Sequence, residues 1–336
     1  MAEASPSING SFFKERNVGL NTSFTDLWSY WHQSVVVQRA DRDTGGRLGT
    51  FFIRAEDDWQ RMHAMLSEDE GYQHVIISPL IDEAKYSPSM LGCVTGQGVL
   101  TTGLQLQLID VPEALCRESA TGVFLGHDWG CQPWSETTEV KAQRMVEAIG
   151  AYLERRGYKG IFEVDFVYDS RTDMLVPIEC NPRFTGVLPV YSLMLAEAGI
   201  PTPEFFHILA HLGIDSRFNF TRVNKAWKQG WKKLSRTYAY ISVTSKGITD
   251  MPLSLTPGIY AYDRHAKEFR FKRPGMFLWD FESDDEFMII DSIPRCSARV
   301  DEGVPRLFKL VFPHRIAQSS REVEPEVGEI ITNQWC

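Results

Sequence analysis

The stretch GYKGIFEVDFVYDSRTDMLVPIECNPRFTG, residues 157–186, decides the fold, because it contains two β runs joined by a short polar turn. Side chains alternate between the two faces of a strand. Two carboxylates therefore share one face of the first run, those of Glu163 and Asp165. Three polar side chains share one face of the second run, those of Glu179, Asn181 and Arg183. If the runs pair antiparallel, carboxylates and an amide lie side by side, with an arginine at the end of the row.

These side chains have the chemistry of a magnesium site. Carboxylate and amide oxygens suit Mg²⁺, which completes its coordination with water and phosphate oxygens. We therefore predict a site for Mg²⁺, with Mn²⁺ as the alternative ion, and for a nucleoside triphosphate on this face. Arg183 is expected to offset charge on a transferred phosphoryl group or to hold a substrate carboxylate. Glu163 is the outermost member of the row, and its position is more typical of a solvated face.

Composition excludes several classes of protein. The 336 residues carry a formal net charge of -9, which argues against a nucleic-acid partner. The six cysteines are widely spaced and form no C-x-x-C pair, so neither a zinc site nor a disulfide framework is indicated. The beginning of the sequence has no apolar core of signal-peptide length, and no apolar run is long enough to span a membrane. We expect a cytoplasmic protein without a membrane partner.

At this point the sequence resembles the ATP-grasp superfamily, whose members carry an acidic residue on one strand and E-x-N-P-R on the next. Here these are Asp165 in FEVDF and Glu179 to Arg183 in ECNPR. The resemblance implies an α+β fold in which two lobes with antiparallel sheets grip ATP, followed by a small β-rich domain. It also implies that Glu179, Asn181 and Arg183 are catalytic, and that Asp165, Glu179 and Asn181 hold magnesium and the phosphates.

The resemblance extends upstream to VVVQRADRDTGGRLGTFFI, residues 35–53, which looks like the mobile lid over the triphosphate. Glycines let backbone amides approach phosphate oxygens closely. The expected ATP contacts in this hairpin are Gln38, Gly45, Gly46, Arg47, Gly49 and Thr50. Gln38 departs from the family, because many relatives place a lysine at the end of this strand.

Two further strands complete the expected ATP site. The run HVIISPLID, residues 74–82, resembles the hinge between the lobes, where Ser78, Leu80 and Ile81 would lie near the adenine. Gln105 and Gln107 alternate onto one face of GLQLQLID. They either line the site, with Gln107 as a contact, or belong to a solvated strand face.

The chain divides into five predicted segments. They are a lead-in with a short helix (1–30), a lid lobe (31–80), a large lobe with the metal site (81–220), a basic linker helix (221–236) and a small β-rich domain (237–336). Relatives carry a further α/β domain ahead of the lid. We therefore expect a form without this pre-ATP-grasp domain, with a separate N-terminal domain or a second copy of the chain as a candidate partner.

Three other stretches carry weaker expectations. The HDWG segment, residues 127–130, is expected in a loop, where His127 or Asp128 either reaches substrate or lies on the surface. In the basic helix candidate at 225–236, Trp227 and Trp231 are expected to pack inward. The acidic stretch from residue 318 onward is expected to fray.

The predicted function is an ATP- and Mg²⁺-dependent carboxylate–amine ligase of the peptide-forming kind. It forms an amide or related C–N bond through an acyl phosphate and releases ADP and phosphate. Two alternatives stay open: a non-catalytic or incomplete ATP-binding subunit of a split enzyme, and a biotin-carboxylase-like enzyme that activates bicarbonate. The sequence does not name the small-molecule carboxylate and amine.

Overall fold

The computed structural model describes residues 16–19, 23–39, 49–67, 74–81, 84–115, 122–214, 218–244, 249–250, 255–291, 299–300 and 307–335. Contacts divide the chain into two compact units, Met1–Glu83 with Thr121–Val123, and Ala84–Ala120 with Phe124–Cys336. Each unit is described by itself. The predicted loop residues Gly45, Gly46 and Arg47 lie outside the described residues.

The first unit contains a 4-stranded antiparallel sheet in the order β1-β4-β2-β3. Its strands are β1 (Arg16–Gly19), β2 (Val35–Arg39), β3 (Thr50–Ile53) and β4 (His74–Pro79). Its helices are α1 (Phe24–Trp31) and α2 (Glu56–Ser67). Strands β2 and β3 pair antiparallel, which confirms the predicted hairpin.

Alternation along these strands separates a core face from a polar face. Val35, Val37 and Ile77 point into a buried core shared with α1 and α2. The core contains, in addition, Leu27, Trp31, Ile53, Trp59, Met62, Leu66 and Val75. The intervening residues of the strands, Gln38 among them, therefore lie on the face turned away from this core.

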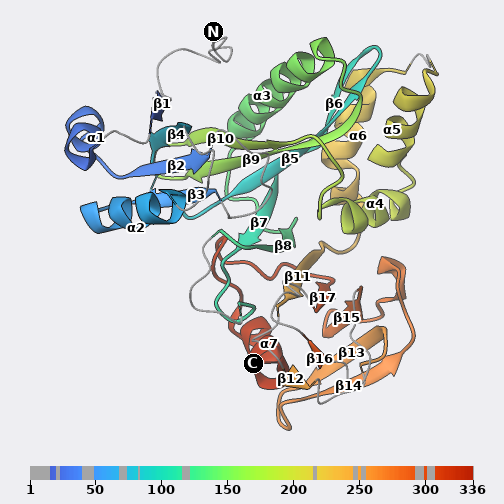
Figure 1. The fold of residues 1–336 in the computed structure, drawn as a ribbon. Helices are drawn as coiled ribbons and strands as arrows, with labels where there is room; N and C mark the ends of the chain where they lie inside the picture. Colours follow the sequence, from blue (N-terminus) through green and yellow to red (C-terminus); the bar gives the residue numbers. More distant parts are fainter. Residues whose placement is uncertain are drawn as a thin grey trace. The chain divides into compact units, whose positions relative to one another are not determined.

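The second unit is built on an 11-stranded sheet in the order β10-β9-β5-β7-β8-β11-β17-β15-β13-β14, with β6 paired to β5 (Figure 1). The strands are β5 (Pro88–Thr95), β6 (Gly98–Thr101), β7 (Gln105–Ile109), β8 (Phe124–Asp128), β9 (Gly160–Asp169), β10 (Met174–Asn181), β11 (Ala239–Val243), β13 (Gly258–Asp263), β14 (Glu268–Arg273), β15 (Glu286–Ile290) and β17 (Phe308–Phe312). β12 (Thr249–Asp250) and β16 (Arg299–Val300) form a separate pair. The helices are α3 (Glu136–Arg155), α4 (Leu188–Glu197), α5 (Pro203–Leu212), α6 (Phe220–Gln229), α7 (Pro325–Trp335) and the short 3-10 helices Trp231–Lys233 and Leu278–Asp280.

Helix α3 covers one face of the sheet at β5, β6 and β10 (Figure 1). Phe162 of β9 is fully buried there. A Cβ atom at Gly92 would lie 2.3 Å from the Phe162 ring, and one at Gly150 of α3 would lie 2.9 Å from it. Only glycine fits at both positions, so the ring fixes the side of β9 that faces α3. The odd-numbered residues Glu163 and Asp165 consequently face the other side.

The opposite face is covered at one end by α4, α5 and α6. Leu91, Cys93 and Ile161 form a buried cluster there with side chains of these helices. Trp227 and Trp231 are 0% and 4% exposed, so the inward packing predicted for them is confirmed. The helix predicted to end at residue 236 is an α-helix over Phe220–Gln229, followed by the 3-10 helix Trp231–Lys233. It begins at Phe220 because the side chain of Asn219 caps it by accepting from the amide of Arg222.

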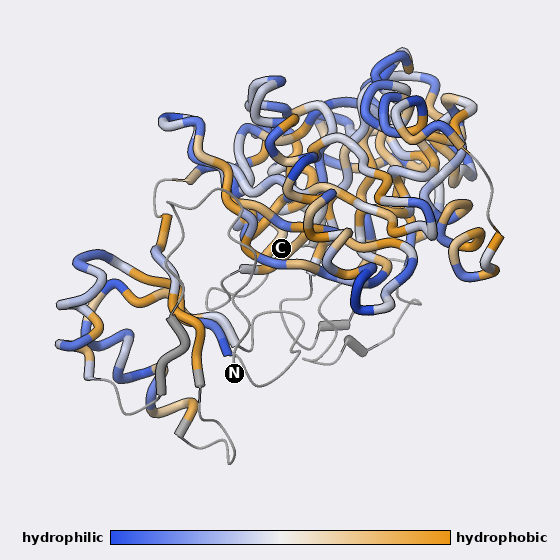
Figure 2. The backbone as a smooth tube through the Cα atoms, turned by 90° about the horizontal axis from the view of Figure 1, so that it is seen from above, coloured by the Kyte–Doolittle hydropathy of each residue, from blue (hydrophilic) through white to orange (hydrophobic). Residues whose placement is uncertain are grey.

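The C-terminal strands continue the same sheet, because β11 pairs with both β8 and β17. Residues 237–336, predicted as a separate small domain, therefore belong to the second compact unit. The prediction of a frayed tail is wrong: α7 forms there and buries Val327, Ile330 and Ile331. Figure 2 shows hydrophobic segments in the interior of each unit and hydrophilic segments mainly at its periphery. Among the described residues, no helix has the length and apolar character needed to cross a membrane.

Candidate functional site

A β-bulge brings the predicted carboxylates together. Strands β9 and β10 pair antiparallel, with Pro177 opposite Phe166 and Glu179 opposite Asp165. Ile178 is the extra residue between these two pairs. Without it, Ile178 would oppose Asp165, and Glu179 would turn toward the face that α3 covers. The bulge therefore places Glu179 and Asn181 on the face of Asp165, with Asn181 opposite Glu163.

Asp165 is the centre of the resulting hydrogen-bond network. Gln107 Nε2 donates to Asp165 Oδ1 at 2.8 Å, and Asn181 Nδ2 donates to Asp165 Oδ2 at 3.1 Å. Arg183 Nη2 donates in turn to Asn181 Oδ1 at 3.0 Å, and its Nη1 donates to the Phe184 carbonyl at 3.2 Å. Gln107 therefore belongs to the Asp165 network. Of its two predicted locations the solvated strand face is excluded, since the residue is only 6% exposed.

The surroundings of Asp165 disfavour the ionised form of its carboxyl group. Burial raises the pKa of Asp165 well above its usual value, and the nearby carboxylates of Glu163 and Glu179 add to the shift. The hydrogen bond from Gln107 and the charge of Arg183 oppose it. Two carboxylates held close together are an arrangement that a bound divalent ion stabilises.

The network continues into the buried centre of the sheet. Ser89 Oγ accepts from Gln105 Nε2 at 3.1 Å and lies 3.2 Å from His127 Nε2. His127 Nδ1 lies 3.2 Å from the hydroxyl of Tyr240, which donates to the carbonyl of Gly186 at 2.6 Å. Gly186 lies three residues after Arg183. The hydrogen bonds of His127 and Tyr240 therefore connect residues 183–186 to β8 and β11.

Glu163 belongs to this buried part, contrary to the prediction of a solvated position. It is 3% exposed, and its Oε1 lies 3.5 Å from His127 Nε2. Burial opposes its ionisation, but His127 and Ser89 together hold the pKa of Glu163 below its usual value. Among the described residues, Glu163 Oε1 and Thr185 Oγ1 have no hydrogen bond of normal geometry.

Sequence reasoning missed Ser89, Thr185 and Tyr240. Ser89 stands directly opposite Asp165 across the β5–β9 pair. Its signal was a polar residue near the start of a largely apolar strand. Tyr240 and Thr185 had no local signal, because each reaches the site only through the tertiary fold.

The HDWG segment is not a surface loop. His127 and Asp128 end the buried strand β8, and both are 0% exposed. Asp128 accepts hydrogen bonds from the amides of Gly130, Cys131, Ile316 and Ala317 at 2.7–3.0 Å. Its carboxylate therefore fastens the segment after β17 to β8 and is not exposed to substrate.

The predicted ATP contacts of the first unit gather on one side of its sheet. Gln38 stands opposite Thr50, and Ser78 stands opposite Val36, so all these side chains share the face away from the core. The carbonyl of Gly49 accepts from the amide of Arg39 at 2.8 Å. The amide of Leu80 donates to the Ser34 carbonyl at 2.9 Å, so this N–H is already engaged. Ile81, which follows Leu80, is half-buried.

The donor set fits magnesium by its chemistry. Within the described residues, no group of three or more His, Cys, Asp or Glu side chains is arranged to hold a metal. The site offers two carboxylates, Asp165 and Glu179, with the amide of Asn181. Such a sparse oxygen set suits an ion that keeps several waters and shares phosphate oxygens, and not a metal that requires a full cage of protein ligands.

No protein-family model matches the chain, and no curated protein sequence matches it. Solved structures do match. The carboxyaminoimidazole ribonucleotide synthase of Aspergillus clavatus complexed with ATP has a TM-score of 0.55 at 10% identity, covering 97% of this chain and 70% of that one. The N5-carboxyaminoimidazole synthase of the same organism, in complex with ADP and 5-aminoimidazole ribonucleotide, has a TM-score of 0.53 at 11% identity over 90% of this chain.

A third similar structure is the biotin carboxylase domain of the 2-oxoglutarate carboxylase of Hydrogenobacter thermophilus, in complex with MgADP, ADP and bicarbonate. Its TM-score is 0.54 at 12% identity over 86% of this chain. This chain spans 64% of the length of the N5-carboxyaminoimidazole synthase and 55% of the length of the carboxylase domain. At these identities the likeness concerns the fold alone. The chain has the α+β ATP-grasp fold.

Proposed function

We propose that this chain is an ATP- and Mg²⁺-dependent ligase that joins a carboxylate to an amine and releases ADP and phosphate. The observation that carries the proposal is the Asp165 network, in which two amides orient one carboxylate and a second carboxylate, Glu179, stands directly opposite. On an ATP-grasp fold, such a face is suited to a metal-bound triphosphate.

The residues have separate roles in this proposal. Asp165, Glu179 and Asn181 would hold Mg²⁺, which when bound neutralises charge on the β- and γ-phosphates. Arg183, anchored by its bonds to Asn181 and Phe184, stabilises negative charge at the transferred phosphoryl group. The face with Gln38, Thr50 and Ser78 supplies neutral hydrogen-bond donors for ATP, together with Gly45, Gly46, Arg47 and Gly49 of the glycine-rich segment.

The reaction proceeds in two balanced steps. An oxygen of the substrate carboxylate attacks the γ-phosphorus, so that the bond to the β-phosphate oxygen breaks and ADP leaves. The amine then attacks the acyl carbon of the mixed anhydride, a C–N bond forms, and phosphate departs with its electron pair while the amine loses a proton. Positioning and charge neutralisation supply most of the acceleration in such phosphoryl transfers.

Substrate-dependent ADP release tests this proposal. The full chain is assayed with Mg²⁺, ATP and pooled carboxylates and amines in bicarbonate-depleted buffer. We expect ADP formation that requires both pools and falls about 100-fold in Glu179→Ala, a change of roughly 2.7 kcal/mol in activation free energy. Glu268→Ala, an exposed strand glutamate of the same unit, serves as the matched control and keeps full activity. Equal activity in both variants contradicts the site assignment.

The assay also separates two alternatives. The similar biotin carboxylase domain, solved with bicarbonate, favours bicarbonate as a second candidate for the activated carboxylate. ADP formation that depends on added bicarbonate and not on the carboxylate pool supports a carboxylase. Tight Mg²⁺-dependent ATP binding without turnover in any mixture supports a non-catalytic or incomplete subunit, and turnover restored by a separate N-terminal domain supports a split enzyme.

A further inference from the structure

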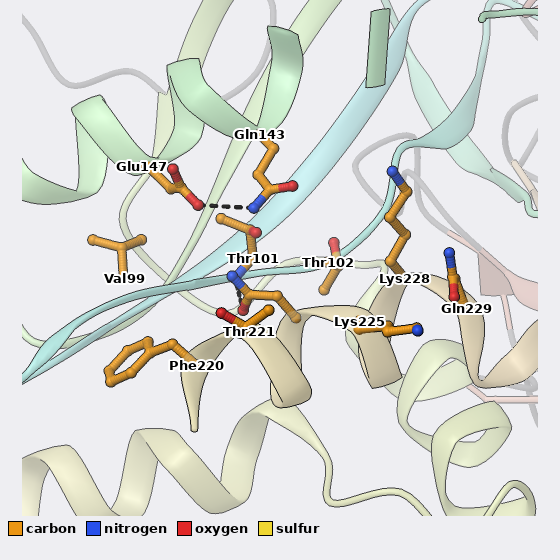
Figure 3. Close-up of a pocket in the computed structure, with 11 residues that line it drawn as sticks. Val99, Thr101, Thr102, Gln143, Glu147, Phe220, Thr221, Lys225, Lys228 and Gln229 are labelled. Carbon is orange, nitrogen blue, oxygen red and sulfur yellow. Dashed lines mark hydrogen bonds between the residues drawn. The ribbon is translucent and has the colours of Figure 1, made fainter. Parts of the chain in front are cut away.

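The second unit contains a pocket that no residue of the Asp165 network lines. It has a volume of about 360 Å³ and lies between α3, β6 and α6 (Figure 3). Its lining is mostly polar and consists of Val99, Thr101, Thr102, Gln143, Glu147, Phe220, Thr221, Asn224, Lys225, Lys228 and Gln229. This volume is at the lower end of the range for small-molecule sites. It suits a metabolite smaller than a nucleotide.

The walls of the pocket are held in place by contacts outside its lining. The Trp227 side chain is fully buried on the other face of α6, and its Nε1 donates to the Pro201 carbonyl at 2.7 Å. On the pocket side, Asn224 Oδ1 accepts from the backbone amide of Thr101 at 3.0 Å. Helix α6 is thus fastened both to the core and to the edge strand β6, so the pocket is built into the fold.

Within the described residues, one buried polar atom of the lining and one beside it have no hydrogen bond. Thr101 is 1% exposed and lines the pocket, and its Oγ1 has no hydrogen bond within the described residues. Lys228 Nζ pairs with Glu139 Oε2 at 3.1 Å, while Glu139 Oε1 is likewise without a hydrogen bond among the described residues. Leaving a buried polar group unpaired costs free energy, so such atoms indicate a missing partner.

Opposite charges stand at the two ends of the pocket. Figure 3 shows Lys225 and Lys228 on one side, and Glu147 with Val99 and Phe220 on the other. Lys225 Nζ forms no ion pair in the part of the chain that the structure describes. Glu147 Oε1 accepts from Gln143 Nε2 at 2.8 Å, which leaves its second oxygen for another donor.

We propose that this pocket binds a free α-amino acid with an apolar side chain. The carboxylate of the ligand pairs with Lys225 and accepts from the Thr101 hydroxyl. Its ammonium group pairs with Glu147, and its side chain contacts Val99 and Phe220. A zwitterion fits better than a simple anion, since the lining carries an acid as well as two lysines. The site is independent of the ligase proposed above.

Calorimetric titration of the full chain with L-leucine, without nucleotide or metal, tests the proposal. We expect saturable binding, at least tenfold weaker for N-acetyl-L-leucine, which lacks the ammonium charge, and for 3-methylbutylamine, which lacks the carboxylate. Lys225→Ala and the isosteric Glu147→Gln each weaken leucine binding at least tenfold. Arg222→Ala, an exposed cation of the same helix outside the pocket, leaves it unchanged.

Four results would each overturn the proposal. They are no saturable leucine binding, equal affinity for the two truncated probes, unchanged affinity in both pocket variants, and binding of inorganic phosphate without leucine, which indicates a simple anion site. Unfolding midpoints of Lys225→Ala and Glu147→Gln establish that both variants are folded. Since no ATP is present, failure here leaves the ligase proposal standing, and failure of ligase activity leaves this site standing.

Discussion

The side-chain amide of Gln107 on β7 donates a 2.8 Å hydrogen bond to Oδ1 of Asp165 on β9, across the intervening strand β5. The donor is neutral, so it orients the carboxylate without cancelling its charge. Asn181 does the same at Oδ2. Two amides thus hold one aspartate in a fixed orientation beside Glu179.

Gln107→Ala is expected to weaken Mg²⁺-dependent ATP binding by roughly three- to tenfold, the equivalent of one hydrogen bond. The pKa of Asp165 is already raised by burial and by Glu163 and Glu179, and Gln107 opposes this shift. Removing Gln107 raises the pKa further, so less carboxylate is ionised. Titration at acidic and at alkaline pH checks this: the defect should shrink as pH rises. Gln60→Ala, on α2, is the control, and a pH-independent defect contradicts the explanation.

Tyr240→Phe is expected to loosen the segment after β10. The Tyr240 hydroxyl donates to the Gly186 carbonyl at 2.6 Å, and its loss costs about 1 kcal/mol of local stability. Hydrogen exchange should then become several-fold faster at the amides of residues 183–187. Tyr238→Phe removes a hydroxyl that donates to Glu197, at the end of α4 and outside residues 183–187, and is the matched control. Equal protection of residues 183–187 in both variants would show that Tyr240 does not position this segment.

The paired carboxylate rows could be predicted from the sequence because alternation along a strand is local. What alternation could not show is the bulge at Ile178, which decides that Glu179 faces Asp165 and not α3. A bulge depends on how the partner strand packs, and here Phe162 between Gly92 and Gly150 fixes that packing. Glu179 and Asp165 do lie side by side as predicted, but only because of a bulge that alternation along the strands does not predict.

The misassigned HDWG segment has a similar origin. His127 and Asp128 look like loop residues because polar groups are rarely buried without partners. Their partners are Tyr240 and the amides of Ile316 and Ala317, more than a hundred residues away in the sequence. Hydrogen-bond partners that are distant in the sequence cannot be identified from the residues around His127 and Asp128. The end of a buried strand was therefore predicted as a loop.

Gly92→Ala is expected to destabilise the second unit by about 2 kcal/mol, typical of overpacking in a rigid core. The new methyl group would lie 2.3 Å from the Phe162 ring, which is itself fully buried. Urea denaturation measures the change. Gly96→Ala, in the turn after β5, meets nothing within 4 Å and should change stability by no more than about 0.5 kcal/mol. Similar midpoints for the two variants would contradict the packing described here.

Glu286→Gln is expected to cost about 2 kcal/mol of folding stability at neutral pH. Burial opposes the charge of Glu286, but two hydrogen bonds from Arg273 and the amides of Glu282 and Ser283 outweigh it and lower its pKa. A lowered folded-state pKa means that this stabilisation is present above the unfolded value of about 4.3. It is lost as pH falls through the folded value.

Urea denaturation of Glu286→Gln and the wild type from pH 7 to pH 3 measures this dependence. The two stability curves should converge at the acidic end. Glu282→Gln removes a carboxylate that is 75% exposed and 3.5 Å from Arg273, so it should change stability by no more than about 0.5 kcal/mol. A constant difference between Glu286→Gln and the wild type at every pH would show that its charge is not the stabilising factor.

The proposed function depends most on the metal–triphosphate face that we assign to Asp165, Glu179 and Asn181. Its most direct test is calorimetric binding of a non-hydrolysable ATP analogue with and without Mg²⁺, in the wild type, Glu179→Ala and the exposed control Glu268→Ala. We predict Mg²⁺-dependent binding in the wild type and Glu268→Ala, weakened about 100-fold in Glu179→Ala, or roughly 2.7 kcal/mol. Binding that is indifferent to Mg²⁺, or equally tight in Glu179→Ala, would contradict the account.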